Sequence, residues 1–309
     1  MTGSPGRRGF SNLDVALIAL LAVLWGSAYI FIRQGLLLGA APLPFAAVRY
    51  ALSAVGFFVI AAGRRAPWPT RSAVIASGAI GGTLFIGLYG GFLYWGEQYT
   101  TGGYASVLSA TAPILTVVVA FAILPEERLS GLALAGIAIG FLGTIVLVVP
   151  ELFGGSIGVW PGPEFVIAAF VCAAFSTVLL RRFGGGPQGL WQIGVQFGVG
   201  ALMLGAATLV LPLPRALPLT GPLLAALAAL VLLSSVGGYF VYFRLHHQVG
   251  PVRANTVAYL LPLAGIGIGT GIFGEPISVW EIAGFLIVIL GVTLVIRDRS
   301  RAAPGVHRA

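Results

Sequence analysis

Two stretches of the sequence match each other. Gly102–Val148 reads GGYASVLSATAPILTVVVAFAILPEERLSGLALAGIAIGFLGTIVLV, and Pro251–Ile296 reads PVRANTVAYLLPLAGIGIGTGIFGEPISVWEIAGFLIVILGVTLVI. Each has an apolar segment of helix length with a proline near its middle, a glutamate 13 positions later, and a second apolar segment with spaced glycines. The matched pairs are Ala105/Ala254, Pro113/Pro262 and Glu126/Glu275 at an offset of 149, Ser130/Ser278, Ala135/Ala283, Gly136/Gly284 and Gly143/Gly291 at 148, and Ser27/Ser176 and Arg33/Arg182 upstream at 149. The pattern indicates an internal duplication.

The composition is that of a membrane protein. Hydrophobic residues make up 58% of the chain, charged residues 8%, and the mean hydropathy is +1.00. Many apolar runs reach roughly 20 residues, the length that crosses a hydrocarbon core. The 45 glycines suit close helix packing in lipid. Cys172 is the single cysteine, so a disulfide within the chain and a thiolate metal site are excluded.

The hydropathy predicts an all-α membrane protein of ten transmembrane helices. The predicted spans are 14–33, 43–62, 73–96, 101–124 and 130–149 in the first half, and 161–180, 188–211, 221–245, 249–273 and 279–296 in the second. Residues 14–149 and 161–296 then form two five-helix repeats. Residues 1–13 and 297–309 form short basic tails. The connections are short and rich in Gly and Pro, so no soluble domain is expected.

The basic residues predict the orientation of these spans. All 17 are arginine, and they lie beside the apolar runs, so they are interpreted as topology signals and not as a nucleic-acid surface. With a cytoplasmic N-terminus, 14 arginines lie inside, Arg33 and Arg215 lie outside, and Arg49 falls within a span. Both termini are therefore expected on the cytoplasmic side of the membrane. Because each half has an odd number of spans, the two repeats are predicted to be inverted in space, as in many secondary transporters.

Several of these residues resemble a known family. The sequence is similar to the drug/metabolite transporter superfamily, specifically the EamA type with two five-helix repeats, over about residues 14–296. The resemblance rests on Trp25-Gly26-Ser27, on Arg49-Tyr50, and on the two proline-to-glutamate motifs with the glycines that follow them. It implies a bacterial inner-membrane carrier. The second half lacks the Trp-Gly pair and a counterpart of Arg49, so the halves are not expected to be functionally equivalent.

The two mid-span prolines are the first candidates for a binding site. A proline within a helix frees the carbonyl four residues earlier, here those of Ser109 and Ala258. Such carbonyls must be satisfied by protein or by a polar cavity, and a matched pair of interrupted helices points to a transporter site. The alternative is a kink that shapes packing alone.

Polar and aromatic side chains at helical spacing extend this candidate site. We predict substrate contacts for Trp25, Tyr29, Arg49, Tyr89, Ser106, Ser109, Tyr239, Tyr242, Asn255 and Tyr259, with helix breaks at Pro113 and Pro262. Aromatic rings stack flat ligands or hold cations, but they also form interfacial belts, the role expected for Trp95, Tyr99 and Trp280. The serines and Asn255 have a structural alternative, hydrogen bonding between helices.

The charged residues have separate roles. Arg49 either attracts a substrate carboxylate or acts as scaffold or gate, and the second role is favoured. Glu126 and Glu275 are expected to fix helix ends as repeat-motif residues. No acid lies at a midplane, and Glu97 near the outer face is the one candidate proton carrier. His246-His247 lacks acidic partners, so no metal site and no other cofactor is expected.

The sequence favours a secondary transporter that moves a small metabolite by alternating access. Export of amino acids or related amphipathic compounds is the favoured activity. The glycine-rich loop at 184–186 has no lysine, so ATP is not expected to drive transport. A membrane-embedded enzyme acting on a lipid or isoprenoid substrate is the alternative, and a passive channel is a third hypothesis. The expected partners are the small-molecule substrate and membrane lipid, and no nucleic acid. Whether the protein forms a homodimer is left open.

Overall fold

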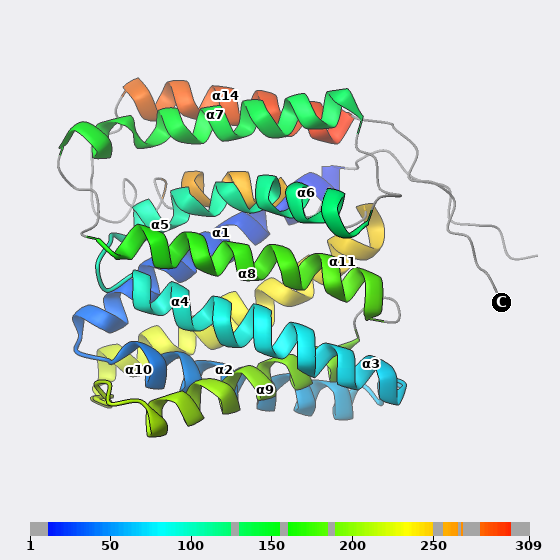
Figure 1. The fold of residues 1–309 in the computed structure, drawn as a ribbon, viewed down its shortest axis with the longest axis vertical. Coiled ribbons are helices and arrows are strands. Elements are labelled where there is room, and N and C mark those ends of the chain that lie inside the picture. The colour runs from blue at the N-terminus through cyan, green and yellow to red at the C-terminus, as the bar shows by residue number, and fades with distance from the viewer. Residues whose placement is uncertain are drawn as a thin grey trace, which may run out of the picture.

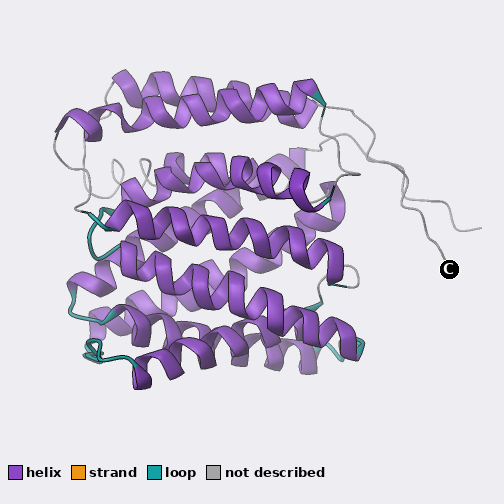
Figure 2. Cartoon of the chain, viewed as in Figure 1, coloured by secondary structure: helices purple, strands orange, loops and turns teal. Residues whose placement is uncertain are grey.

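The computed structural model describes residues 12–124, 130–154, 160–184, 189–249, 256–264, 267 and 279–297. The described residues form helices joined by loops and contain no strand (Figure 2), which confirms the prediction of an all-α protein. The first half contains α1 (Asn12–Leu37), α2 (Pro42–Gly63), α3 (Arg71–Ala76), η1 (Ser77–Leu88), α4 (Tyr89–Gly96), α5 (Gly102–Leu108), η2 (Ser109–Thr111), α6 (Ala112–Ile123) and α7 (Gly131–Gly154). The second contains α8 (Gly162–Phe183), α9 (Leu190–Val210), α10 (Gly221–Ala229), η3 (Leu230–Gly237), α11 (Gly238–Val249), η4 (Thr256–Leu260) and α14 (Val279–Arg297).

Six helical segments of the described chain are long and apolar enough to cross a membrane. They are Leu13–Leu37, Pro42–Gly63, Arg71–Gly96, Gly162–Phe183, Leu190–Val210 and Gly221–Tyr242. Shorter apolar helices occur at Ala112–Ile123, Leu134–Val146 and Ile282–Leu294. At about 1.5 Å per residue, a helix of 22 residues spans roughly 30 Å, the thickness of a hydrocarbon core. The protein is a multi-pass membrane protein.

Local sequence signals explain where the helices begin. Proline stands in the first turn of α2, where its missing N–H costs no hydrogen bond. The turn before α2 contains Gly39 at φ +90°, a conformation that glycine adopts without strain. At the start of α9, the backbone N–H of Gly189 donates to the side-chain Oε1 of Gln192 at 2.8 Å, which satisfies a donor that the helix leaves open.

The helices α7 and α14 pack side by side at one edge of the bundle (Figure 1). A Cβ added at Gly143 would lie 2.6 Å from the backbone N of Val288 and 3.0 Å from the carbonyl of Gly284. A Cβ at Gly291 would lie 2.7 Å from the carbonyl of Gly136. As α7 advances from Gly136 to Gly143, its partner therefore runs backwards from Gly291 to Gly284, so the helices are antiparallel. The matched glycines of the two sequence copies form this contact reciprocally.

A second antiparallel pair lies at the opposite edge, where α2 packs against α9 (Figure 1). The ring of Trp191 lies 6.0 Å from that of Phe58, whereas the ring of Phe197, further along α9, lies 5.6 Å from that of Tyr50. A Cβ at Gly194 would overlap Phe58. Glycine thus admits a large ring, and the two helices approach closely at this point.

The third and eighth predicted spans each contain a π-helical stretch, η1 and η3. These stretches end at Leu88 and Gly237, positions that are 149 residues apart and so correspond in the two sequence copies. A π-helix is rare and often marks a functional segment. Tyr89 directly follows η1, and Tyr239 lies two residues after the end of η3.

Candidate functional site

A cavity of about 160 Å³ lies inside the bundle, with lining residues from α1, α2, α6, α8, α9 and α11 among others. Pockets for drug-sized ligands usually measure about 300–1,000 Å³. This cavity is smaller, so its size suits a small metabolite. Side chains from both halves of the chain line it. The lining residues are Trp25, Ala28, Tyr29, Ile32, Arg49, Tyr50, Phe85, Ile86, Tyr89, Leu93, Ser109, Ala112, Pro113, Thr116, Phe170, Ala173, Thr177, Phe197, Ser234, Tyr239, Tyr242, Val257, Ala258 and Leu261.

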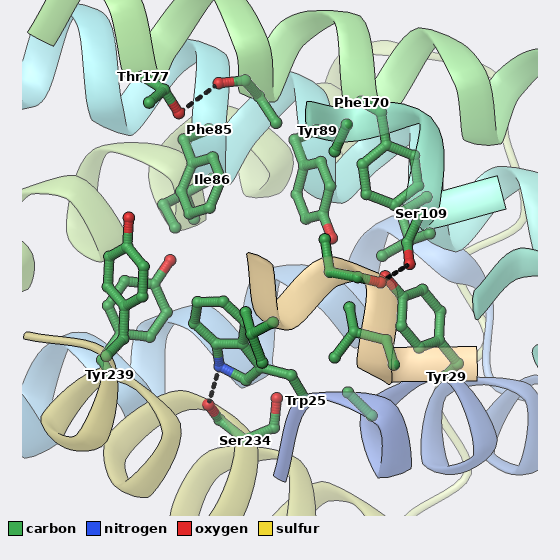
Figure 3. Close-up of a pocket in the computed structure, with 18 of the residues that line it drawn as sticks. Trp25, Tyr29, Phe85, Ile86, Tyr89, Ser109, Phe170, Thr177, Ser234 and Tyr239 are labelled. Carbon is green, nitrogen blue, oxygen red and sulfur yellow. Dashed lines mark hydrogen bonds between the residues drawn. The ribbon is translucent and has the colours of Figure 1, made fainter. Parts of the chain in front are cut away.

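Aromatic rings from several helices face the cavity (Figure 3). Trp25 of α1 lies in the middle, with its ring centroid 5.8 Å from that of Tyr239 and 5.1 Å from that of Tyr242. The indole N–H of Trp25 donates to the backbone carbonyl of Ser234 at 3.2 Å, which holds the ring in place. On another side, the ring of Phe85 stacks on Tyr89 at 5.3 Å. A ligand in this space meets flat apolar faces with hydroxyl groups at their edges.

Arg49 is the charged residue in the lining, and it is almost fully buried. Its guanidinium donates to the hydroxyls of Ser235 at 3.2 Å, Tyr94 at 3.0 Å and Ser234 at 2.9 Å. These bonds join α2 to α4 and to η3, and so connect the two halves of the chain. A guanidinium has five N–H groups, so the bonds to described residues leave two of them for a ligand. Arg49 therefore cross-links helices of the two halves beside the cavity.

The proline breaks meet beside the cavity. The hydroxyl of Ser109 donates to the carbonyl of Ser106 and lies 3.5 Å from the carbonyl of Ala258, the group that Pro262 frees. The carbonyl of Ser109 accepts the N–H of Ala112 in a 3₁₀ turn. Ser109 and Ala258 are 149 residues apart, so equivalent positions of the two sequence copies touch. The structure thus brings the two interrupted helices into contact.

Most of the predicted contact residues lie in this lining. They are Trp25, Tyr29, Arg49, Tyr89, Ser109, Tyr239 and Tyr242, together with the helix break at Pro113. Ser106 is buried but lies outside the lining, and so does Pro262. Asn255, Glu126 and Glu275 lie outside the described residues, as does the side chain of His246. Tyr99 and Trp280 are exposed and Trp95 is half-buried, in positions open to lipid or headgroups.

Tyr259, another predicted contact, also lies outside the lining. Its side chain is fully buried but faces away from the cavity, and its hydroxyl donates to the carbonyl of Ile137 in α7 at 3.2 Å. Its ring packs against Gly140 of α7, where an added Cβ would lie 3.2 Å from the ring. Val257, Ala258 and Leu261 from the same stretch line the cavity, whereas Tyr259 points to α7.

Sequence reasoning missed several lining residues. Phe170 and Thr177 come from α8, and Phe197 comes from α9. The spacing of Phe170, Ala173 and Thr177 fits one helix face, the same signal that marked the predicted residues. In an apolar span, however, such spacing does not separate a cavity face from a packed one.

The described lining residues include one arginine and no carboxylate, histidine or cysteine. Among the described residues, no group of three or more His, Cys, Asp or Glu side chains is placed to hold a metal ion. Polar contacts to a ligand would therefore come from the guanidinium, the hydroxyls and backbone carbonyls.

Comparison with protein families explains this architecture. The model of the EamA-like transporter family matches residues 13–149 and again residues 160–297. The chain belongs to this family. Its two matches cover the two halves that the sequence repeat defines.

Relatives of this EamA-like transporter carry transporter names. A protein named an uncharacterized transporter in Archaeoglobus fulgidus is 28% identical over 92% of this chain and 98% of its own length. The Escherichia coli K12 protein named uncharacterized inner membrane transporter YedA is 29% identical, over 91% of this chain and 89% of its own. A protein of Streptantibioticus cattleyicolor named probable terminal-alkyne amino-acid exporter is 27% identical, over 93% and 96%. A solved crystal structure aligns with a TM-score of 0.67 at 22% identity, over 92% of this chain and 96% of that one, and so shares the fold.

Proposed function

We propose that this chain is a secondary transporter of the inner membrane that moves a small amphipathic metabolite, such as an amino acid, by alternating access. The favoured direction is export. The observation that carries the proposal is a central cavity lined from both halves of the chain, with a buried arginine, aromatic faces and hydroxyls. A binding site between two halves can open to either side of the membrane when the halves exchange conformations.

The proposal includes ten membrane helices in two inverted repeats, residues 14–149 and 161–296, with both termini cytoplasmic. Support comes from helix pairs that correspond in the two sequence copies. The pairs α7–α14 and α2–α9 each join equivalent helices of the two halves, and each pair is antiparallel. Antiparallel packing of equivalent helices is what a direct repeat inverted in space produces. The contact between Ser109 and Ala258, equivalent positions, is consistent with an approximate two-fold axis beside the cavity.

The substrate class follows from the chemistry of the lining. Arg49 has N–H groups left for an anion, and a carboxylate accepts two parallel hydrogen bonds from a guanidinium. The rings of Trp25, Tyr89 and Tyr239 offer apolar faces and, for an ammonium group, cation–π contacts. A carboxylate at Arg49 with an apolar or aromatic body against the rings therefore fits the site. The name of the S. cattleyicolor relative, an amino-acid exporter, agrees with this class.

A counterflow assay tests the proposal. Proteoliposomes are loaded with single unlabelled amino acids, and entry of the same labelled amino acid is measured. We expect accelerated uptake for at least one apolar or aromatic amino acid. The matched variants are Tyr89→Phe and Tyr259→Phe, because both remove a buried tyrosine hydroxyl but Tyr89 alone lines the cavity.

The expected result is a raised KM for Tyr89→Phe and an unchanged KM for Tyr259→Phe. Equal effects of the two variants would contradict the assignment of the cavity as the substrate site. Absence of counterflow with every amino acid, by protein that is folded and reconstituted, would overturn the substrate class. A transported sugar, nucleoside or cationic drug would then replace it.

A further inference from the structure

Glu97, directly after α4, is a buried acid that the cavity does not explain. Its exposed fraction is 0%, and neither carboxyl oxygen has a hydrogen-bond partner among the described residues. Three residues further along, the hydroxyl of Thr100 is also buried and without a partner there. Glu97 does not line the cavity. A buried charge without partners is costly, so the carboxyl is neutral in this conformation.

Two arginines lie close enough to act on Glu97, but both are bonded elsewhere. Arg33 of α1 donates to the backbone carbonyls of Glu97 at 2.8 Å and Gln98 at 3.0 Å. Arg49 of α2 donates to Tyr94, Ser234 and Ser235. Within the described chain, neither arginine forms a hydrogen bond to the Glu97 carboxyl. The acid is therefore near two cations without being paired to either.

The other ionisable groups around Glu97 do not neutralise it. Tyr29 of α1, Tyr50 of α2 and Tyr94 of α4 are buried tyrosines on the surrounding helices, and none of them hydrogen-bonds to its carboxyl. The first turn of α8, which packs against Gly96, carries Glu164, and that side chain is exposed. Burial raises the pKa of Glu97 well above the ordinary carboxyl value, and the positive charges of Arg33 and Arg49 oppose that rise only in part.

We propose that Glu97 is a proton-binding site whose occupancy is coupled to the movement of the two halves. This inference rests on the proposed transport function. When Glu97 loses its proton, the carboxylate needs donors, and the guanidinium groups of Arg33 and Arg49 are the charged donors at hand. Arg49 is held by the two serines of η3, so a turn of its guanidinium toward the carboxylate would strain or break those bonds. Because those bonds join α2 in the first half to η3 in the second, proton release loosens a contact between the halves.

The proton balance is simple. Glu97 takes a proton from water on one side of the membrane, holds it while buried and neutral, and releases it to water on the other side after the halves rearrange. No bond other than that to the proton forms or breaks. An imposed pH gradient would then drive the substrate.

Infrared spectroscopy tests proton binding without any substrate. Protein in vesicles is titrated from about pH 5 to about pH 9, and the C=O stretching band of protonated carboxyl groups is followed. We expect the wild type to keep this band at pH values above the range where ordinary carboxyls titrate. Glu97→Gln should lose the band at those pH values. The matched control is Glu164→Gln, because Glu164 is an exposed acid at the same end of the bundle. A band that survives in Glu97→Gln would overturn the proposal.

Driven transport tests the coupling. Proteoliposomes with an imposed pH gradient are compared with vesicles without one, using an amino acid that shows counterflow. Wild type and Glu164→Gln are expected to accumulate that amino acid against its gradient, and Glu97→Gln to equilibrate it without accumulation. Accumulation by Glu97→Gln equal to that of the wild type would refute the coupling. If the wild type shows no counterflow with any amino acid, the proposed substrate class fails, and the infrared titration still decides whether Glu97 binds the proton.

Discussion

Replacement of Arg49 by lysine separates the geometry of this side chain from its charge. The guanidinium spans three hydroxyls on two other helices, at 3.2, 3.0 and 2.9 Å. A lysine ammonium keeps the positive charge but is a point donor that cannot reproduce the planar fork. We therefore expect Arg49→Lys to weaken both the contact between the halves and the binding of a carboxylate.

The magnitude follows from the number of bonds at stake. Hydrogen bonds to a charged group contribute about 1.5–3 kcal/mol each. If a ligand carboxylate uses the two N–H groups that the hydroxyls leave open, their loss costs about 3 kcal/mol. That corresponds to roughly a 100-fold weaker affinity, since about 1.4 kcal/mol is tenfold.

Ligand-induced thermal stabilisation measures this affinity. The probes are phenylalanine and phenylalaninamide, which differ in the group that would face Arg49. We expect the wild type to prefer the carboxylate, and Arg49→Lys to lose most of that preference. Arg71→Lys is the matched control, because Arg71 is exposed at the start of α3. If Arg49→Lys binds both probes as the wild type does, then Arg49 does not hold the carboxylate and its role is structural.

Three further predictions concern stability, each measured by thermal unfolding in detergent. The Gly143→Ala change places a Cβ 2.6 Å from the backbone N of Val288, so we expect the free energy of unfolding to fall by about 1–3 kcal/mol. The control is Gly131→Ala, where nothing lies within 4 Å and the change should stay within about 0.5 kcal/mol. Equal effects of the two variants would contradict the close packing. The Tyr259→Phe change removes a buried hydrogen bond of 3.2 Å to α7 and should cost about 1 kcal/mol; no loss would show that this bond contributes nothing. Because burial raises the pKa of Glu97, the native state holds a proton that the unfolded chain releases, and wild-type stability falls as pH rises through the ordinary carboxyl pKa toward the raised value. Glu97→Gln cannot ionise, so its melting temperature relative to the wild type should increase between about pH 4 and about pH 8, and a constant difference would refute a raised pKa.

Much of the site could be predicted because its residues are unusual for a membrane span. Arg49 and the two prolines are costly in lipid, so their presence already points to a polar or irregular place in the fold. Trp25, Tyr29, Tyr239 and Tyr242 follow helical spacing on predicted spans and do line the cavity. Tyr259 follows the same spacing but lies outside the lining. Helical spacing does not show this, because the bond of its hydroxyl to Ile137 depends on how η4 packs against α7.

The sequence by itself determined the helical class, the membrane environment and the duplication, because hydropathy and repeat offsets are properties of the chain order. It also marked the glycines whose small size allows α7 and α14 to meet. Only the tertiary structure decided which faces turn inward. It joined Arg49 to η3, brought Ser109 to Ala258, and left Glu97 buried without a partner. These contacts link residues up to 186 positions apart, so they depend on how helices pack and not on local pattern.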